Sequence, residues 1–160
     1  MKVAILDVYS PRKLRTSKDT NGGYGTCNDY GHGFVPQVLN WVKNKSSNWP
    51  SLYSVYTAAV LSDNGYEVEF IKTGIDKLNP RGLSGFELVL LTSSIVCHES
   101  ELKAIKLLKP HVPVGVLGSF ASSVPEPYVN AGAFVIAGEP DFYFLHHPEI
   151  EFLKKANGVI

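Results

Sequence analysis

Short apolar runs alternate with helix-forming segments along the chain, and this alternation restricts the fold more than any other feature. Such alternation is typical of βαβ units, in which helices join parallel strands. We expect five strands, over Lys2–Tyr9 and residues 66–71, 86–92, 112–117 and 134–137. Residues 86–92 (FELVLLT) are apolar almost throughout, which predicts a strand buried on both faces. Residues 66–71 (YEVEFI) alternate in polarity, as an edge strand does.

The segments between these strands predict helices. Residues 51–64 place apolar side chains at helical spacing, and we expect them to form one buried face: Leu52, Val55, Tyr56, Ala59 and Val60. Residues 99–109 are expected to direct Leu102, Ile105 and Leu108 inward. A short helix should begin near Pro125. Right-handed crossovers and five strands favour a flavodoxin-like, doubly wound parallel sheet of order 2-1-3-4-5 with helices on both faces.

The connection between the first strand and its helix, residues 10–50, is longer than the fold needs. It has about forty residues, where a βα loop normally has about 2–6, and loops of that length are usually functional or disordered. Residues 34–43 are expected to form a helix of their own, resting over the sheet edge. The glycine-rich stretch 21–33 (NGGYGTCNDYGHG) has neither a GK[ST] ending nor a GxGxxG. We interpret it as a flap that closes over a bulky ligand.

Composition and charge argue against several classes of function. The 160 residues suffice for one domain, and 15 basic residues balance 15 acidic ones, so we expect no nucleic-acid partner. No apolar run approaches the roughly 20 residues that span a bilayer, and Asp7 comes too early for a signal-peptide core. The two cysteines, Cys27 and Cys97, make no disulfide framework. These features predict a cytoplasmic protein with no membrane partner.

Several segments are expected to meet at one edge of the sheet. Ligands of open α/β sheets bind beyond the carboxyl ends of the strands. The segments that follow the predicted strands at this edge are the long first loop and residues 93–98, 118–123 and 138–141. Small and hydroxyl-bearing residues in these segments let backbone amides approach a ligand closely, although each residue taken singly also fits a plain turn. The candidate cofactor-binding residues are Asp7, Ser93, Ser94, Gly118, Ser119, Ser122, Gly138 and Glu139.

No catalytic or metal-binding constellation stands out in the sequence. Cys97 and His98 are neighbours at a helix start, so their side chains diverge and do not make the pair that a thiolate nucleophile needs. We expect Cys97 to be a small buried residue. Cys27 and His32 lack a second pair of ligands at a recognised spacing. We therefore predict no catalytic residues and no metal ligands.

Four segments, in order, resemble the N-terminal cobalamin-binding (B12-binding) domain of radical SAM enzymes. Residues 49–68, which contain WPSL, AAVL and NGYEV, are similar to the first helix and second strand of that domain. Residues 117–126 (LGSFASSVPE) resemble its GG.h.T..PE segment, and residues 133–140 (AFVIAGEP) resemble its D.V..GEGE segment. Residues 151–160 look like the linker that precedes the radical SAM barrel. The resemblance covers residues 1–160 and is weakest over 10–48.

The resemblance implies a division of the chain and a role for it. Residues 1–150 would be the cobalamin-binding domain, with a long insertion at 10–50, and residues 151–160 would begin the linker toward a radical SAM domain. The implied function is that of the cobalamin module of a methyltransferase-type radical SAM enzyme, with no catalysis by this chain alone. The implied partners are the barrel, in the same parent protein, and a small-molecule or peptide substrate.

The resemblance also implies which residues hold the cofactor. By position, Ser93, Ser94, Gly118, Ser119 and Gly138 would line the site for the corrin and its nucleotide tail, and the loop with Tyr24 and Trp41 would cover it. A [4Fe–4S] cluster and S-adenosylmethionine would belong to the barrel alone. Two cysteines seventy residues apart cannot hold such a cluster, and the CxxxCxxC motif is absent from this chain.

Departures from the family pattern support alternative functions. None of the five histidines stands in the motif Asp-x-His-x-x-Gly, which supplies the lower cobalt ligand in typical cobalamin carriers. Ser119 replaces the second glycine of the GG pair, and Pro140 replaces the second glycine of GEGE. One alternative is a degenerate domain without corrinoid that acts as a substrate-binding or docking module. Another is a free-standing flavodoxin-like enzyme or flavoprotein.

Overall fold

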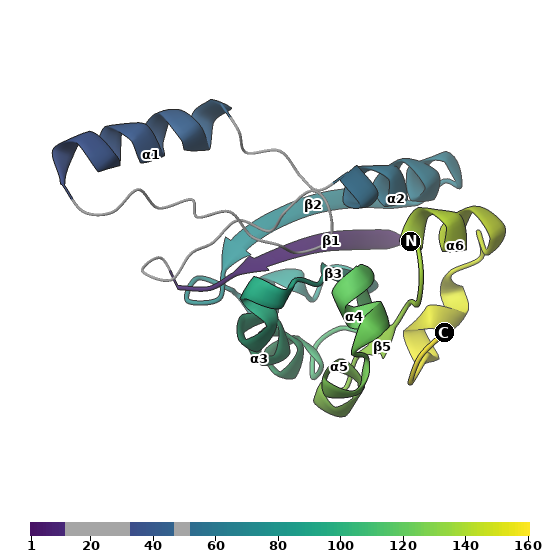
Figure 1. The fold of residues 1–160 in the computed structure, drawn as a ribbon. Helices are drawn as coiled ribbons and strands as arrows, with labels where there is room; N and C mark the ends of the chain where they lie inside the picture. The colour runs from purple at the N-terminus through teal and green to yellow at the C-terminus, as the bar shows by residue number, and fades with distance from the viewer. Residues whose placement is uncertain (12–32, 47–51) are drawn as a thin grey trace.

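The computed structural model describes residues 1–11, 33–46 and 52–160 of the chain. Five parallel strands form one sheet in the order β2-β1-β3-β4-β5, which confirms the predicted flavodoxin-like α/β topology (Figure 1). Their bounds are β1 Lys2–Tyr9, β2 Glu67–Gly74, β3 Leu88–Thr92, β4 Val114–Leu117 and β5 Phe134–Val135. Each strand overlaps a predicted run, and β2 lies at an edge of the sheet, as its alternating pattern indicates.

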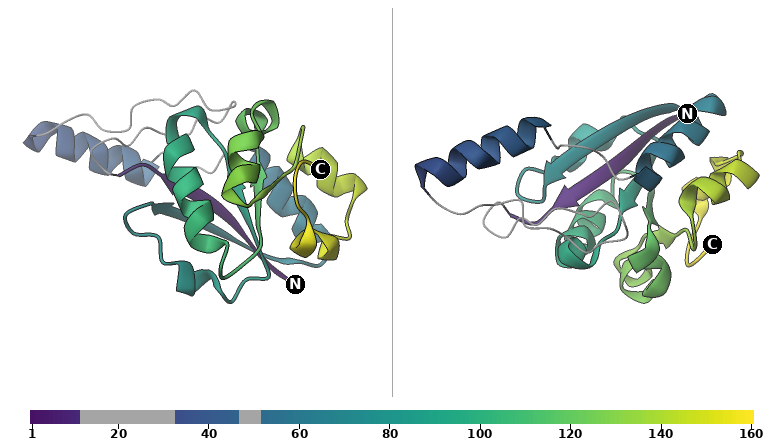
Figure 2. Two further views of the ribbon diagram at one scale, coloured as in Figure 1. Left: turned by 90° about the horizontal axis from the view of Figure 1, so that it is seen from below. Right: turned by 45° about the horizontal axis from the view of Figure 1, so that its top comes forward.

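Helices cover both faces of the sheet (Figures 1 and 2). Their bounds are α1 Phe34–Ser46, α2 Leu52–Asp63, α3 His98–Leu108, α4 Ser119–Ser123, α5 Glu126–Ala131 and α6 Pro140–His146, with 3-10 turns η2 Pro80–Leu83, η3 Ile95–Cys97 and η4 Glu151–Lys155. Strand β1 shows why two layers form: Leu6 packs in the core under α3 and α5, whereas Ile5 packs in the core under α2 and α6. Successive strand residues point to opposite faces, so an apolar strand needs a cover on both.

Helix α2 forms where predicted, but the predicted buried face is wrong. Its buried residues are Ser54, Thr57 and Leu61, while Leu52 is 53% exposed and Tyr56 is 55% exposed. The Thr57 hydroxyl donates a hydrogen bond of 2.7 Å to the carbonyl oxygen of Tyr53 in its own helix. Small hydroxyl side chains of this kind can therefore be buried against the sheet with their polar atoms paired. The apolar face that includes Val55 and Ala59 faces solvent instead.

Helix α1 confirms the helix predicted over residues 34–43 but not the expected position over the sheet edge. Its large apolar side chains are exposed, and Phe34 reaches 83%. The exposed residues are Phe34, Val35, Val38, Leu39, Trp41 and Val42. The helix lies apart from the sheet (Figure 1), so α1 and α2 each present an apolar surface to solvent.

The other helices agree better with the sequence. In α3, Ile105 and Leu108 are fully buried and Leu102 is partly buried, as predicted. Helix α5 begins directly after Pro125. Helices α4 and α6 were not predicted, because each has fewer than two full turns with periodic side chains. None of the helices in the described ranges is both long enough and apolar enough to cross a membrane.

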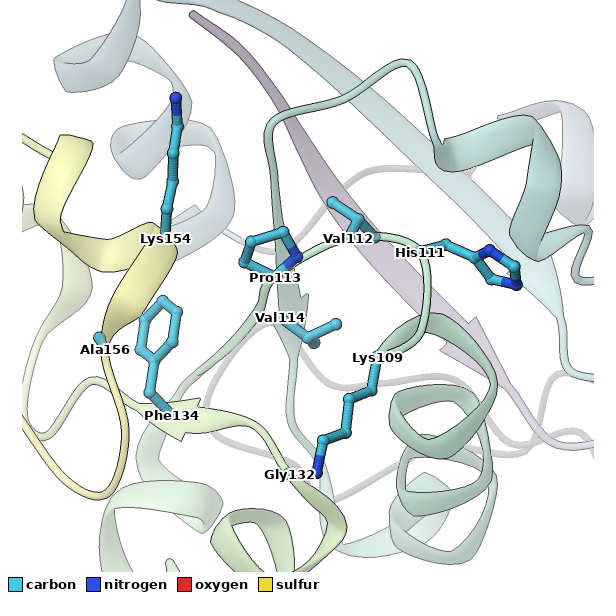
Figure 3. Close-up of a pocket in the computed structure, with 9 residues that line it drawn as sticks. All are labelled: Lys109, His111, Val112, Pro113, Val114, Gly132, Phe134, Lys154 and Ala156. Carbon is cyan, nitrogen blue, oxygen red and sulfur yellow. The ribbon is translucent and has the colours of Figure 1, made fainter.

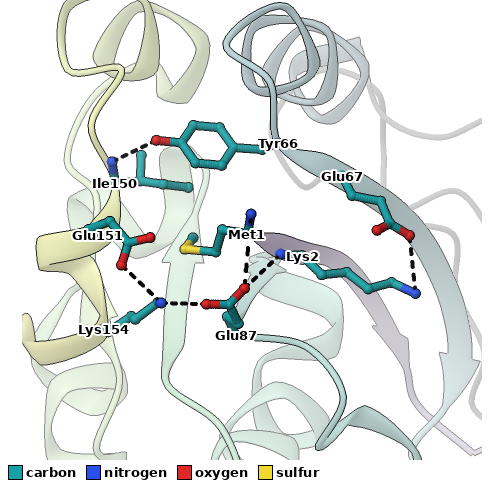
Figure 4. A network of polar contacts seen from close by, with 8 residues as sticks. All are labelled: Met1, Lys2, Tyr66, Glu67, Glu87, Ile150, Glu151 and Lys154. Carbon is teal, nitrogen blue, oxygen red and sulfur yellow. Dashed lines mark hydrogen bonds and ion pairs between the residues drawn. The ribbon is translucent and has the colours of Figure 1, made fainter.

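The C-terminal residues pack onto the domain. Ile150 and Leu153 have no exposed surface and belong to the core on the α2 side. The Ile160 amide donates a hydrogen bond of 2.9 Å to Val135, and the segment runs parallel to β5. At the amino-terminal edge of the sheet, Lys154 Nζ lies 2.5 Å from Glu87 Oε2 and 2.9 Å from a carboxylate oxygen of Glu151 (Figure 4).

Candidate functional site

Hydrogen bonds link the segments that follow β3, β4 and β5 at the carboxyl edge of the sheet. The Ala121 amide donates to Ser93 Oγ at 3.1 Å, which joins the segments after β3 and β4. The Gly138 amide donates to Ser122 Oγ at 3.1 Å, which joins the segments after β4 and β5. The structure therefore brings together the three later segments that topology predicts to meet.

Half of the predicted site residues are buried; we call Asp7, Ser93, Ser94 and Gly118 the inner group. Asp7 is 2% exposed and accepts a hydrogen bond from the hydroxyl of Thr92. Ser94 has no exposed surface; its hydroxyl donates to Glu101 at 3.2 Å and accepts from the Cys97 amide at 3.2 Å. The side chains of this group hold the loops in place rather than face the solvent.

Gly118 is the glycine of the inner group, and its surroundings leave little room for a side chain. Its φ of +109° is a conformation that side-chain-bearing residues rarely adopt. A Cβ atom there would lie 3.0 Å from Ser93 Oγ and 3.4 Å from the hydroxyl oxygen of Tyr53. Tyr53, on α2, thus closes the space beside the β4–α4 turn. Tyr53 could not be predicted from the sequence, because only the tertiary packing of α2 brings it to the edge.

The remaining predicted residues form what we call the outer rim: Ser119, Ser122, Gly138 and Glu139. Ser119, Gly138 and Glu139 are exposed, and Ser122 is partly buried. Gly138 has φ +83°, and no atom lies within 4 Å of the place where its Cβ would be. The Ser122 hydroxyl also donates to the Gly118 carbonyl at 3.0 Å, which fixes the rim to the inner group. The rim offers a ligand a hydroxyl, a carboxylate and open backbone.

Cysteine and histidine side chains were also considered in the sequence, as nucleophiles or metal ligands. Among the described residues, no group of three or more His, Cys, Asp or Glu side chains is placed to hold a metal ion. Cys97 is a buried free thiol, as predicted, and His98 bonds to Tyr128 rather than to Cys97. The glycine-rich stretch, with Tyr24, Cys27 and His32, lies outside the described residues.

A cavity of about 350 Å³ lies at the opposite, amino-terminal edge of the sheet (Figure 3). It is lined by Lys109, His111, Val112, Pro113, Val114, Gly132, Phe134, Lys154 and Ala156. Val114 and Phe134 are the first residues of β4 and β5. The side chains of His111 and Lys154 point away from each other, so they do not converge on one point of the cavity. None of the predicted site residues lines it.

Fold and site together define a flavodoxin-like α/β domain with a polar rim at the carboxyl edge of its sheet. Comparison with protein-family models finds no match, and comparison with curated proteins finds no significant match.

Proposed function

We propose that this domain binds cobalamin across its outer rim and serves as the cofactor module of a methyltransferase-type radical SAM enzyme. The observation that carries the proposal is the set of exposed polar groups on hydrogen-bonded loops at the carboxyl edge, which is the ligand-binding edge of this topology. The segments that supply those groups are also the ones that resemble the cobalamin-binding domain.

The chemistry of the rim suits the periphery of a corrinoid. Cobalamin carries amide side chains around its ring, and these both donate and accept hydrogen bonds. The exposed hydroxyl of Ser119 and carboxylate of Glu139 match such groups, and the open backbone at Gly138 allows close approach. When bound, cobalamin supplies the methyl-transfer or radical chemistry. The residues of this chain bind and orient it.

The inner group limits how the cofactor binds. The hydroxyl oxygens of Ser93 and Tyr53 would lie 3.0 Å and 3.4 Å from a Cβ atom at Gly118, and the Ser94 hydroxyl donates its hydrogen bond to Glu101. A nucleotide tail inserted between β3 and β4 would have to displace the Tyr53 side chain. We therefore propose that the corrinoid lies on the rim and that its tail remains outside the sheet.

The exposed apolar surfaces of α1 and α2 support a partner for this domain. Phe34 and Trp41 on α1 are 83% and 59% exposed, and Leu52 on α2 is 53% exposed. Contiguous exposed apolar surfaces mark interaction sites. We propose that the partner is a radical SAM barrel in the parent protein. That barrel would hold the [4Fe–4S] cluster and S-adenosylmethionine and would act on a small-molecule or peptide substrate.

The proposal can be tested with hydroxocobalamin. Anaerobically purified protein should shift the visible spectrum of the corrinoid and retain it through gel filtration. Glu139→Gln combined with Ser119→Ala should weaken retention, whereas Glu149→Gln should not. Glu149 is an exposed acid next to Pro148, whose carbonyl accepts a hydrogen bond from Tyr66 at the amino-terminal edge of the sheet. A corrinoid that elutes free of the wild-type protein, with an unchanged spectrum, would contradict the proposal.

The buried inner group favours a second candidate, a degenerate module without corrinoid. Asp7 and Ser94, which the prediction places in the site, make their hydrogen bonds inside the protein. Such a domain would act as a substrate-binding or docking platform. Binding of a peptide or metabolite substrate to protein that takes up no hydroxocobalamin would favour this candidate over the first.

A further inference from the structure

A chain of hydrogen bonds leads from a buried acid to a histidine at the carboxyl edge. The Tyr128 hydroxyl lies 2.7 Å from Glu101 Oε2, and His98 Nδ1 lies 3.1 Å from the Tyr128 oxygen. Ser94 donates to the other carboxylate oxygen of Glu101 at 3.2 Å. Glu101 and Tyr128 have no exposed surface, while His98 is partly buried. The chain therefore connects the interior with the edge.

The direction of this chain fixes the proton on the histidine ring. A tyrosine hydroxyl has one proton, and a carboxylate only accepts hydrogen bonds. Burial, together with the nearby Glu101 carboxylate, raises the pKa of Tyr128 above its usual range, so the hydroxyl keeps its proton. That proton points to Glu101, so the Tyr128 oxygen accepts from His98. Nδ1 of His98 must then carry a hydrogen, and in the neutral ring Nε2 has the lone pair.

Aromatic contacts hold the His98 ring in one orientation. Its centroid lies 5.3 Å from that of Phe120 and 5.1 Å from that of Tyr128, both edge to face. The two ring nitrogens point in nearly opposite directions, so with Nδ1 at Tyr128 the Nε2 atom points away from the buried pair. Among the described residues, none makes a hydrogen bond to Nε2. Phe120 lies on α4, the short helix that also carries Ser119 and Ser122, so the His98 ring packs against an element that supplies the outer rim.

We propose that His98 is a ligand contact of the rim, with Nε2 accepting a hydrogen bond from an amide N–H of the bound ligand. Tyr128 and Glu101 are positioning residues that select the ring tautomer. The identity of the ligand as a corrinoid rests on the proposed function, and the side-chain amides of a corrinoid supply the donor. The hydrogen bonds from Glu101 through Tyr128 to His98, which we call the relay, are present in the protein without ligand.

The tautomer is measured first, on ligand-free protein labelled with ¹⁵N at histidine, by long-range ¹H–¹⁵N correlation at a pH where the ring is neutral. The expected result is hydrogen on Nδ1 and a bare Nε2 at His98. Tyr128→Phe removes the acceptor and should shift the ring toward the mixture of tautomers of free histidine. Wild-type protein with hydrogen on Nε2 of His98 would overturn the relay, whether or not the variant folds.

The ligand contact is measured next, by titration with hydroxocobalamin. His98→Asn keeps an amide N–H near the position of Nδ1 but has no acceptor in place of Nε2. The variant should therefore fold normally and bind hydroxocobalamin about tenfold more weakly. His98→Gln can place an oxygen near the Nε2 position and should bind nearly as tightly as wild type. Equal affinity of His98→Asn and wild type would overturn the contact. Absence of any wild-type binding would instead overturn the proposed function, and the tautomer result would still decide the relay.

Discussion

The hydroxyl of Tyr128 donates a hydrogen bond of 2.7 Å to Oε2 of Glu101, and neither residue has any exposed surface. Tyr128 lies on α5 and Glu101 on α3, so this bond ties together the two helices that pack beside each other under the sheet. The same carboxylate accepts from Ser94 at the carboxyl edge. Stability and the geometry of the candidate site are therefore coupled through one buried acid.

Removing the Tyr128 hydroxyl should destabilise the protein. Tyr128→Phe keeps the ring in the core but deprives the buried Glu101 carboxylate of a donor, which costs about 1–3 kcal/mol in the free energy of unfolding. Urea denaturation at neutral pH measures the loss. Tyr56→Phe is the matched control, because Tyr56 is 55% exposed. Equal stability of Tyr128→Phe and wild type would show that the bond contributes nothing net.

The stability lost by Tyr128→Phe should shrink at alkaline pH. The pKa of Tyr128 is raised in the folded protein, so above the usual tyrosine value of 10.0 the unfolded chain releases this proton first. The free energy of unfolding then falls by up to about 1.4 kcal/mol per pH unit through Tyr128 alone. Tyr128→Phe lacks this contribution. Urea denaturation between about pH 8 and pH 11 should show the two proteins converge; a constant gap would contradict the assignment.

The ion pairs at the amino-terminal edge should protect the fold against acid. The hydrogen bond from Lys154 lowers the pKa of Glu87 below its usual value of 4.5. The stability gained from Glu87 is therefore present above pH 4.5 and is lost as the pH falls through the lowered folded-state pKa. Glu87→Gln should lower the melting temperature by no more than a few degrees at neutral pH, since exposed pairs contribute little. Its melting temperature should then fall less than that of wild type below pH 4.5. Glu149→Gln, the control, should keep the wild-type acid response.

Two glycines of the site should respond differently to alanine. Gly118→Ala forces a side chain into φ +109° and to within 3.0 Å of Ser93 Oγ, so it combines backbone strain with a close contact. Gly138→Ala meets strain alone, because the space around it is open. Backbone strain of this kind costs about 1–3 kcal/mol, and the loss at Gly118 should exceed the loss at Gly138. The free energies of unfolding of the two variants test this, and the reverse order would contradict the described packing.

Much of the fold was predictable because its signals are local. The apolar run in β3 and the alternating run in β2 each identify a strand and its place in the sheet. The buried face of α2 was not predictable from periodicity. Its apolar residues, such as Leu52 and Tyr56, have helical spacing, yet the helix packs through Ser54 and Thr57. Which face a helix buries depends on the partner surface, and no local pattern encodes that surface.

The candidate site was predictable only at the level of segments. Topology places the turns after β3, β4 and β5 at one edge, and hydrogen bonds join them there. Ser94 and Ser119 look alike in sequence, but Ser94 is buried and Ser119 is exposed. The hydrogen bond between His98 and Tyr128 was not predictable either, because the two residues lie 30 positions apart in the chain.

The most direct test of the central claim is a titration of ¹⁵N-labelled protein with hydroxocobalamin, followed by the chemical shifts of the backbone amides. Binding across the outer rim predicts changes at Ser119, Gly138 and Glu139, at the carboxyl edge. Gly132 and His111, which line the cavity at the amino-terminal edge, should stay unchanged. Changes confined to Gly132 and His111, or no changes at saturating corrinoid, would contradict a cobalamin site at the rim.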